Sequence, residues 1–270
     1  MPQELNAVVT QRIEVAPGLI ILRVAPDGWE LPEFQAGQFT VLGLPGSAPR
    51  ADFSDPEPEP PAPDKLIRRA YSIASSSREQ DYLEFYITLV RSGELTPRLF
   101  ALKVGDPVFL NTKISGLFTL RDVPKDSDLV LIATGTGLAP YMSMLRGEID
   151  CHAGHRTAVI LGAYHSWDLG YRGELIDMQR FCETFDFIPV ISAPEQEVRP
   201  WSGHTGFIQE LWKNGVIEET WGRKPTPETT HILLCGNPKM IEAMLEVLGE
   251  EGFTEHTRKQ PGQIHLEKFW

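Results

Sequence analysis

The hydrophobic pattern of this 270-residue chain changes near residue 122, and that change limits the possible folds more than any other feature. Before it, residues 5–120 contain short runs rich in β-branched and aromatic residues, many separated by Asp-Gly, Pro-Gly or Gly-Asp pairs. Short strands at this spacing favour a closed antiparallel barrel. The runs are LNAVVTQRIEV, LIILRVA, GQFTVLGL, RAYSIAS, YLEFYITLV and DPVFLNTKI. A short helix is predicted within LTPRLFAL, with Thr96 as its N-cap and Pro97 in its first turn.

Beyond residue 128, apolar β-rich runs alternate with helical patterns. The strand-like runs are DLVLIATG, TAVILGAY, FDFIPVIS and HILLCG, and the helical stretches are APYMSMLRGEI, ELIDMQRF and KMIEAMLEVLGEEG. Strands that alternate with helices indicate a parallel sheet with both faces covered. The sequence therefore predicts two domains, an antiparallel β-barrel over residues 1–121 and an α/β domain with a parallel sheet over 122–270.

Charge, termini and cysteines exclude several classes of protein. The net charge of −12 disfavours non-specific nucleic-acid binding. The N-terminus, MPQELNAVVT, lacks the pattern of a secretory signal, and no apolar run reaches the about 18 residues of a membrane helix. The three cysteines, Cys151, Cys182 and Cys235, are odd in number and far apart, which argues against a disulfide framework and against a metal or iron–sulfur site. We therefore expect a cytoplasmic protein without a metal centre.

A proline-rich segment interrupts the barrel half. Residues 45–64 hold many of the chain's prolines, and 51–64 also carries five acidic residues. This composition predicts an exposed loop inside the barrel. It is followed by RRAYS, where two arginines and a tyrosine are either a ligand site or a solvated charge pair beside a barrel tyrosine.

Two strand-to-helix turns in the second half carry glycines. IATGTGLAPYMSML passes from a strand through Gly135–Gly137 into a helix, and free N–H groups at such a turn suit a phosphate. A tight structural turn explains this motif equally well, because the third glycine of G-x-G-x-x-G is missing. In HILLCGNPKMIEAML, Asn237 is a natural N-cap before Pro238. Cys235 ends that strand, either at a ligand-binding edge or as a buried structural cysteine.

Together and in this order, these motifs resemble the ferredoxin–NADP reductase family, most closely its bacterial ferredoxin/flavodoxin–NADP reductase branch. The signature is RAYS and CGNP with GTGLAP between them, and the resemblance also covers AGQFTVLGL, LEFYITLV, GELTPRLFALKVGD, DLGY, HTGFI and PGQIHLEKFW. The insertion at 51–64 looks longer than the family usually carries. The resemblance implies an FAD-binding barrel and an NAD(P)-binding α/β domain whose C-terminal tail returns to the FAD.

The resemblance also assigns FAD contacts. Arg69 would bind the diphosphate of FAD, where its planar fork can reach two oxygens. Tyr71 would stack on the isoalloxazine, Ser72 would direct its hydroxyl at the flavin, and Trp270 would cover the cofactor. The other residues implied at the FAD are Ala70, Tyr86, Thr88, Gly93, Glu94, Leu95, Thr96 and Thr134.

The same resemblance implies a site for NADP(H), with NAD(H) as an alternative. Cys235 would lie near the hydride path, and Glu267 is a weaker candidate for proton handling. Together with Ser72 they are the implied catalytic residues. The other residues implied at the nicotinamide nucleotide are Gly135, Thr136, Gly137, Tyr164, Ala193, Phe207 and Gly236.

The implied activity is electron transfer between NAD(P)H and ferredoxin or flavodoxin by a monomer. Such carriers are acidic, and basic residues of the barrel half offer a complementary surface. These basic residues are Arg68, Arg69, Arg91, Arg98, Lys103 and Lys113. One alternative is the reductase component of an oxygenase, although the three scattered cysteines exclude the fused iron–sulfur domain that such components usually carry. Another is a flavin-binding electron-relay subunit without nucleotide turnover.

The chain departs from its family where the 2′-phosphate of NADPH is recognised. Arginines that grip this phosphate in the bacterial branch correspond here to Tyr164, Ala193 and Phe207. Since none of these carries a charge, we expect weak discrimination between NADPH and NADH. Nearby cationic side chains that could compensate in part are His165, Arg199 and His204.

Overall fold

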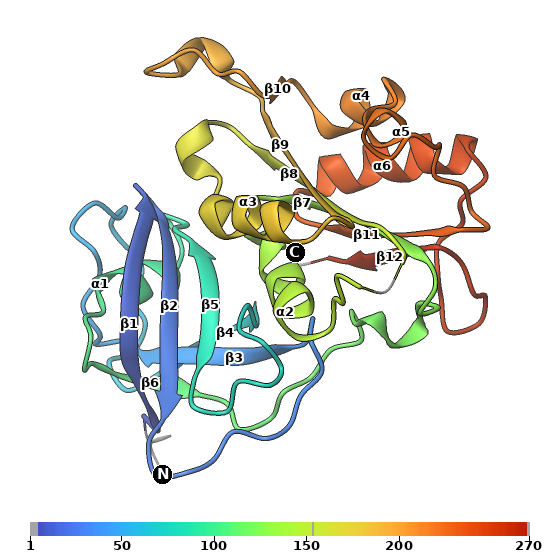
Figure 1. Cartoon of the computed structure of the whole chain (residues 1–270). Coiled ribbons are helices and arrows are strands. Elements are labelled where there is room, and N and C mark those ends of the chain that lie inside the picture. The colour runs from blue at the N-terminus through green and yellow to red at the C-terminus, as the bar shows by residue number, and fades with distance from the viewer. Residues whose placement is uncertain (1–4, 153, 269–270) are drawn as a thin grey trace. The chain divides into compact units, whose positions relative to one another are not determined.

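The computed structural model describes residues 5–152 and 154–268, which pack as two compact units. One unit contains the residues up to Thr119 together with Ala139–Glu148, and the other contains Leu120–Leu138 and the residues from Ile149 onward. Figure 1 colours the chain by residue number, so both units can be followed there. The domain boundary expected between residues 121 and 122 stays a prediction, because a packing unit and a folding domain need not coincide.

The first unit is built on a six-stranded antiparallel sheet with the order β4-β3-β6-β1-β2-β5 (Figure 1). The edge strands β4 and β5 are joined by a bridge between Ile73 and Phe85 and by a 2.8 Å hydrogen bond from Ala74 N to Glu84 O. These contacts close the sheet into a barrel, and the predicted strands are confirmed. The strands are β1 (Ala7–Ala16), β2 (Leu19–Pro26), β3 (Phe39–Pro45), β4 (Leu66–Ser72), β5 (Leu83–Thr88) and β6 (Pro107–Leu110).

The predicted short helix is confirmed as α1 (Thr96–Ala101), but the predicted cap is wrong. Leu95 is the N-cap residue, and it makes no side-chain capping bond. The Thr96 hydroxyl instead donates to Val90 O at 3.1 Å and accepts from Val90 N at 3.0 Å. The hydroxyl therefore closes the 90–96 loop by contacting a residue six positions earlier in the chain. A rule for helix capping does not predict such a contact.

Helix α2 (Ala139–Gly147) is attached to the first unit by a buried ion pair. Glu84 is only 2% exposed and accepts hydrogen bonds of 2.7 Å from both Arg23 and Arg146. Arg146, on α2, also donates to Ala74 O at 2.8 Å. A carboxylate removed from water needs such partners, since its desolvation is costly.

The second unit is built on a six-stranded parallel sheet with the order β10-β9-β8-β7-β11-β12. The four predicted strands are confirmed, whereas β10 and β12 were not predicted because they are short and carry His, Thr or Glu. The strands are β7 (Asp128–Thr134), β8 (Thr157–Ala163), β9 (Phe185–Ile191), β10 (His204–Thr205), β11 (Thr230–Cys235) and β12 (Ile264–Glu267).

Helices cover the two faces of this sheet. α4, α5 and α6 pack on one face through Trp212, Ile217 and Met244, and α3 lies on the other side (Figure 1). These helices are α3 (Arg172–Phe181), α4 (Ile208–Lys213), α5 (Val216–Trp221) and α6 (Pro238–Glu250). Short 3-10 turns follow several strands, as η2 (Gly135–Leu138), η3 (Ser166–Asp168) and η4 (Pro194–Gln196), and η1 (Leu120–Asp122) precedes β7. In the described residues, no helix is long and apolar enough to cross a membrane.

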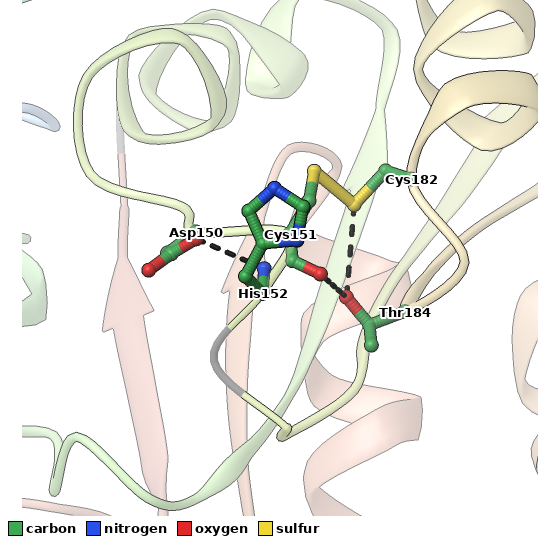
Figure 2. The surroundings of a disulfide bond; sticks show 5 residues. All are labelled: Asp150, Cys151, His152, Cys182 and Thr184. Atoms are coloured by element: carbon green, nitrogen blue, oxygen red, sulfur yellow. Dashed lines mark hydrogen bonds between the residues drawn. A yellow bond between two sulfur atoms is a disulfide. The ribbon is translucent and has the colours of Figure 1, made fainter.

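The expectation that the cysteines form no disulfide is wrong for one pair. Cys151 and Cys182 form a disulfide with their Cα atoms 5.2 Å apart, and Thr184 Oγ1 donates to Cys151 O at 3.2 Å (Figure 2). The pair is 31 residues apart in sequence, but each cysteine shortly precedes one of the neighbouring strands β8 and β9. Because these strands are parallel, the loops that lead into them meet at one edge of the sheet. Cys235 is free and buried.

We predict that Glu84→Gln strongly destabilises the protein. The substitution leaves the guanidinium groups of Arg23 and Arg146 without their shared carboxylate, and breaking a buried pair in this way costs about 3–5 kcal/mol. Urea denaturation followed by circular dichroism measures the change in unfolding free energy. Glu33→Gln, at an exposed site, is the matched control, and equal midpoints for the two variants would contradict the role given to the buried pair.

Candidate functional site

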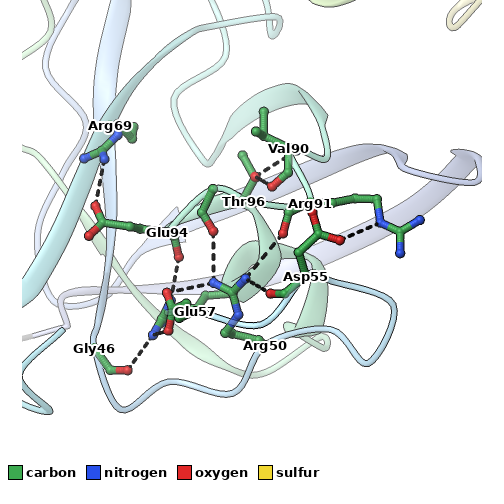
Figure 3. A network of polar contacts seen from close by, with 11 residues as sticks. Gly46, Arg50, Asp55, Glu57, Arg69, Val90, Arg91, Glu94 and Thr96 are labelled. Carbon is green, nitrogen blue, oxygen red and sulfur yellow. Dashed lines mark hydrogen bonds and ion pairs between the residues drawn. The ribbon is translucent and has the colours of Figure 1, made fainter. Parts of the chain in front are cut away.

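Edge strand β4 brings Arg69 beside the loop that precedes α1. The Arg69 side chain is 56% exposed and donates to Glu94 Oε2 at 2.9 Å (Figure 3). It also donates to Arg68 O at 2.8 Å. The structure therefore brings together Arg69 and the Gly93–Thr96 loop, which the sequence assigned to one site. An exposed guanidinium beside a loop with backbone N–H groups is suited to a diphosphate.

Next to Arg69, β4 carries an aromatic ring and a sheltered hydroxyl. Tyr71 is partly buried and packs edge-to-face on Phe85, with 6.4 Å between ring centroids. Burial raises the pKa of Tyr71 well above its usual value, so the phenol is neutral at physiological pH. Ser72 is 7% exposed. The other residues expected here lie on the same barrel, Ala70 and Thr88 exposed and Tyr86 buried.

Behind the 90–96 loop lies an ionic network that the sequence did not reveal. Arg98 is 2% exposed, and its guanidinium donates to Glu57 Oε1 at 2.7 Å and Oε2 at 2.9 Å. Arg50 donates to the same Glu57 Oε1 at 2.8 Å. No local pattern distinguishes Glu57 from Glu59 in the run PEPEPP, and only the fold brings Glu57 to Arg98.

This network corrects two expectations. Arg98 is buried and ion-paired, so it cannot belong to an exposed basic surface for an acidic partner. The segment 45–64 is largely exposed as expected, but it is anchored rather than free. Ala51 N donates to Pro97 O at 2.9 Å, Asp55 N donates to Arg91 O at 3.0 Å, and Glu57 holds the arginines.

In the second unit, two glycine-containing turns meet at the carboxyl ends of β7 and β11. The Thr134 hydroxyl accepts a 2.7 Å hydrogen bond from Asn237 N, and Asn237 Oδ1 accepts one of 2.9 Å from Lys239 N. The second bond confirms Asn237 as the N-cap of α6. Gly137 packs so closely on the Cys235 carbonyl that any side chain there would collide with it.

The strand order reverses at this point. β8, β9 and β10 continue the sheet on one side of β7, and β11 and β12 continue it on the other. Ligands of open α/β sheets bind at such a switch point, beyond the carboxyl ends of the strands. Gly135, Thr136, Gly137 and Gly236 all lie there. The FAD contact expected of Thr134 stays a prediction.

Cys235 lies at the end of β11, paired in register with Glu267 on β12. It has no exposed surface, and its Sγ lies 4.0 Å from Glu267 Oε2. Burial, and then the Glu267 charge, raise the pKa of the Cys235 thiol. Cys235 is therefore a neutral thiol beside a carboxylate at neutral pH. Its burial agrees with a structural role, and its catalytic role stays a prediction.

Farther along the same sheet edge, the loops after β8 and β9 lie against each other, with Ala193 N donating to Tyr164 O at 3.0 Å. Tyr164 is 71% exposed, and Phe207, the N-cap residue of α4, is 63% exposed, whereas Ala193 is buried. The three positions expected to replace arginines thus present two exposed aromatic rings and no charge.

A carboxylate occupies the turn beside Tyr164. Ser166 donates to Glu197 from its backbone N and from its hydroxyl, each at 2.7 Å, and these bonds lower the pKa of Glu197. His165 stacks on Trp167 with 4.4 Å between ring centroids and contacts Gln196 and Asp168 through its two ring nitrogens. Hydrogen bonds to Gln196 and then Asp168 raise the pKa of His165 despite opposing desolvation.

Trp270 lies outside the described residues. Within residues 5–152 and 154–268, no group of three or more His, Cys, Asp or Glu side chains could hold a metal ion.

Comparisons with known proteins agree on the kind of chain. Residues 131–246 match the family model of the oxidoreductase NAD-binding domain. The chain is 34% identical to a flavodoxin/ferredoxin–NADP reductase from Escherichia coli and 31% identical to one from Buchnera aphidicola, in each case over 88% of both chains. A ferredoxin NADP⁺ reductase from Neisseria gonorrhoeae, solved with bound FAD and NADP, superposes with a TM-score of 0.82 at 27% identity over 98% of both chains.

We predict that Cys235 resists alkylation in the folded protein at neutral pH. Only the thiolate reacts, and burial beside Glu267 disfavours it. Mass spectrometry measures the alkylation of Cys235 after iodoacetamide treatment between about pH 7 and 9. In urea, Cys235 should react readily under the same conditions. Rapid modification of the folded protein would contradict the environment described for this thiol.

Proposed function

This chain belongs to the family of flavodoxin/ferredoxin–NADP reductases, and we propose that it is an FAD-dependent reductase that exchanges electrons between NADP(H) and a flavodoxin or ferredoxin. The observation that carries the proposal is that one chain contains two sites of different chemistry, one in each unit. The barrel presents Arg69, Tyr71 and Ser72 on one strand, and the parallel sheet presents Gly135–Gly137 at its switch point.

The residues of the barrel fit FAD. The exposed Arg69 supplies a guanidinium for the diphosphate, Tyr71 supplies a neutral ring that can stack on the isoalloxazine, and Ser72 supplies a hydroxyl beside it. Aromatic stacking adds about 0.5–1.5 kcal/mol beyond burial. When bound, FAD would supply the redox chemistry, since it takes up two electrons as a hydride and gives them up singly.

The chain's own residues bind and position the reactants. Gly135–Gly137, which has few side-chain atoms, lets the phosphates of the nucleotide approach the protein backbone at the carboxyl end of β7. Cys235 keeps its proton at the buried end of β11, and Glu267 is the group beside it that can hold a proton.

The partner is proposed to dock on the basic side chains of the barrel. Arg68 and Lys103 are exposed, as are Arg69, Arg91 and Lys113, whereas Arg98 is excluded by its burial. A complementary basic surface would speed association with an acidic carrier. A monomer is proposed as the working form. A cytoplasmic location stays a prediction, and the Cys151–Cys182 disulfide weighs against a strongly reducing compartment.

The coenzyme site is proposed to discriminate weakly between NADPH and NADH. Tyr164, Ala193 and Phe207 offer no cation, and each arginine replaced removes a charge-assisted bond of about 1.5–3 kcal/mol. The Ser166 N–H and hydroxyl, which could bind a phosphate, are already taken by the Glu197 carboxylate. The negative charge of Glu197 opposes a second anion there, while His165 offers partial compensation.

We predict that Arg69→Ala weakens FAD binding more than Tyr71→Ala does. The arginine variant leaves the diphosphate charge without its partner, whereas the tyrosine variant loses only stacking. Fluorescence titration of the apoprotein with FAD measures both dissociation constants. Arg68→Ala, the exposed neighbour, is the matched control, and wild-type affinity in both site variants would refute the proposed FAD site.

We predict that kcat/KM for NADPH and NADH differs by less than about a hundredfold, which is about 2.7 kcal/mol. Steady-state reduction of purified flavodoxin and ferredoxin with each coenzyme measures this ratio and tests the proposed activity itself. Glu197→Gln should shift the ratio toward NADPH, with Glu195→Gln as the control. A larger NADPH preference in the wild type would overturn the expectation and point to His165, Arg199 or His204 as the phosphate site.

A further inference from the structure

Glu57, in the proline-rich segment 51–64, lies between two arginines that come from different parts of the barrel. Arg98 on α1 reaches both of its carboxylate oxygens. Arg50 reaches Oε1 at 2.8 Å (Figure 3). Hydrogen bonds from Arg98, followed by the charges of both arginines, lower the pKa of Glu57. Glu57 is therefore an anion at neutral pH and neutralises part of the charge of two guanidinium groups.

The same two guanidinium groups hold the backbone of the 90–96 loop. Arg50 donates to Gly93 O at 2.9 Å, and Arg98 donates to Glu94 O at 2.6 Å. Each of these donors is the NH1 group that also bonds to Glu57. The carboxylate thus fixes the side chains that fix two consecutive carbonyl groups.

Fixing these carbonyls also fixes two N–H groups. A trans peptide is planar, and its N–H points opposite to its C=O. None of the peptide bonds among the described residues is cis. Because the carbonyls of Gly93 and Glu94 point at the arginines, the N–H groups of Glu94 and Leu95 point away from them. The loop is also closely packed, since a Cβ on Gly93 would lie 3.0 Å from Val90 O.

Removal of the carboxylate would disturb this arrangement. Arg98 is 2% exposed, so its charge cannot be solvated in place and its other acceptors are neutral carbonyls. Without Glu57, the guanidinium groups of Arg50 and Arg98 would lie near each other with no carboxylate between them. A buried charge that loses its partner is expensive, and the arginines would move or draw in water. Either response releases the carbonyls of Gly93 and Glu94.

We infer that Glu57 is a positioning residue for the FAD diphosphate, which acts through Arg50 and Arg98 to hold the N–H groups of Glu94 and Leu95 in a phosphate-binding orientation. The inference rests on the proposed FAD site and deepens it. It gives the proline-rich segment a role, since this segment carries the carboxylate to the back of the loop and is itself anchored at Asp55, whose carbonyl accepts a 2.8 Å hydrogen bond from Arg50.

The test compares FAD with riboflavin, which has the same ring but no phosphate. In Glu57→Gln, the dissociation constant of the apoprotein for FAD should rise by about tenfold or more, because charge-assisted bonds behind the loop are lost. The affinity for riboflavin should not change. Glu59→Gln, an exposed glutamate of the same segment, should bind both ligands as wild type does, and Glu57→Asp should recover part of the FAD affinity.

A spectroscopic readout separates positioning from general stability. The ³¹P resonances of bound FAD should shift in Glu57→Gln and not in Glu59→Gln, whereas a merely structural loss would lower the thermal midpoint and leave these resonances unchanged in the folded fraction. Wild-type FAD affinity and ³¹P resonances in Glu57→Gln would overturn the inference. So would an equal loss of FAD and riboflavin affinity.

A second variant covers the case in which Glu57→Gln does not fold. Arg50→Lys keeps the charge at a more exposed position but cannot reach Glu57, Gly93 and Asp55 at once. It should also weaken FAD and spare riboflavin, and wild-type FAD affinity would overturn the inference. Arg69→Ala separates the two levels of the argument. If Arg69→Ala retains FAD, the proposed site is wrong, and if it loses FAD while Glu57→Gln and Arg50→Lys retain it, only the positioning role is wrong.

Discussion

An arginine that is removed from water needs a carboxylate beside it, and the first unit depends on two such pairs. Glu84 holds Arg146 and thereby attaches α2 to the barrel. Glu57 holds Arg98 and thereby attaches the proline-rich segment to the loop before α1. In both places the charge pair joins segments distant in sequence, so the barrel gains fixed positions for side chains that its hydrogen-bonded strands alone would not provide.

The parallel sheet imposes a different constraint, because its strands all end at one edge. Thr134 and Asn237 tie the β7 and β11 turns together there, and the small Gly137 allows their close approach. Cys235 and Glu267 end neighbouring strands at the same edge. Strand direction and order thus bring the ends of β7, β11 and β12 together at one edge of the sheet.

Electrostatics separates the two ligand regions of the molecule. The region of the barrel proposed to bind a diphosphate offers Arg69, with two further guanidinium groups paired to Glu57 behind its loop. The far edge of the parallel sheet offers aromatic rings and the Glu197 carboxylate. The exposed guanidinium of Arg69 is the basis of the diphosphate site proposed for the barrel, and the uncharged Tyr164, Ala193 and Phe207 are the basis of the weak discrimination proposed between NADPH and NADH.

The sequence by itself determined the strands other than β10 and β12, the longer helices, the Asn237 cap and the family, because hydrophobic period, turn residues and motif order act locally along the chain. It also located the RAYS and Gly93–Thr96 segments of one site without showing how they meet. Only the tertiary structure decided that Cys151 reaches Cys182, that Thr96 closes a loop instead of capping α1, and that Arg98 is buried against Glu57. These contacts join residues through space, and their energies depend on burial, which no local pattern records.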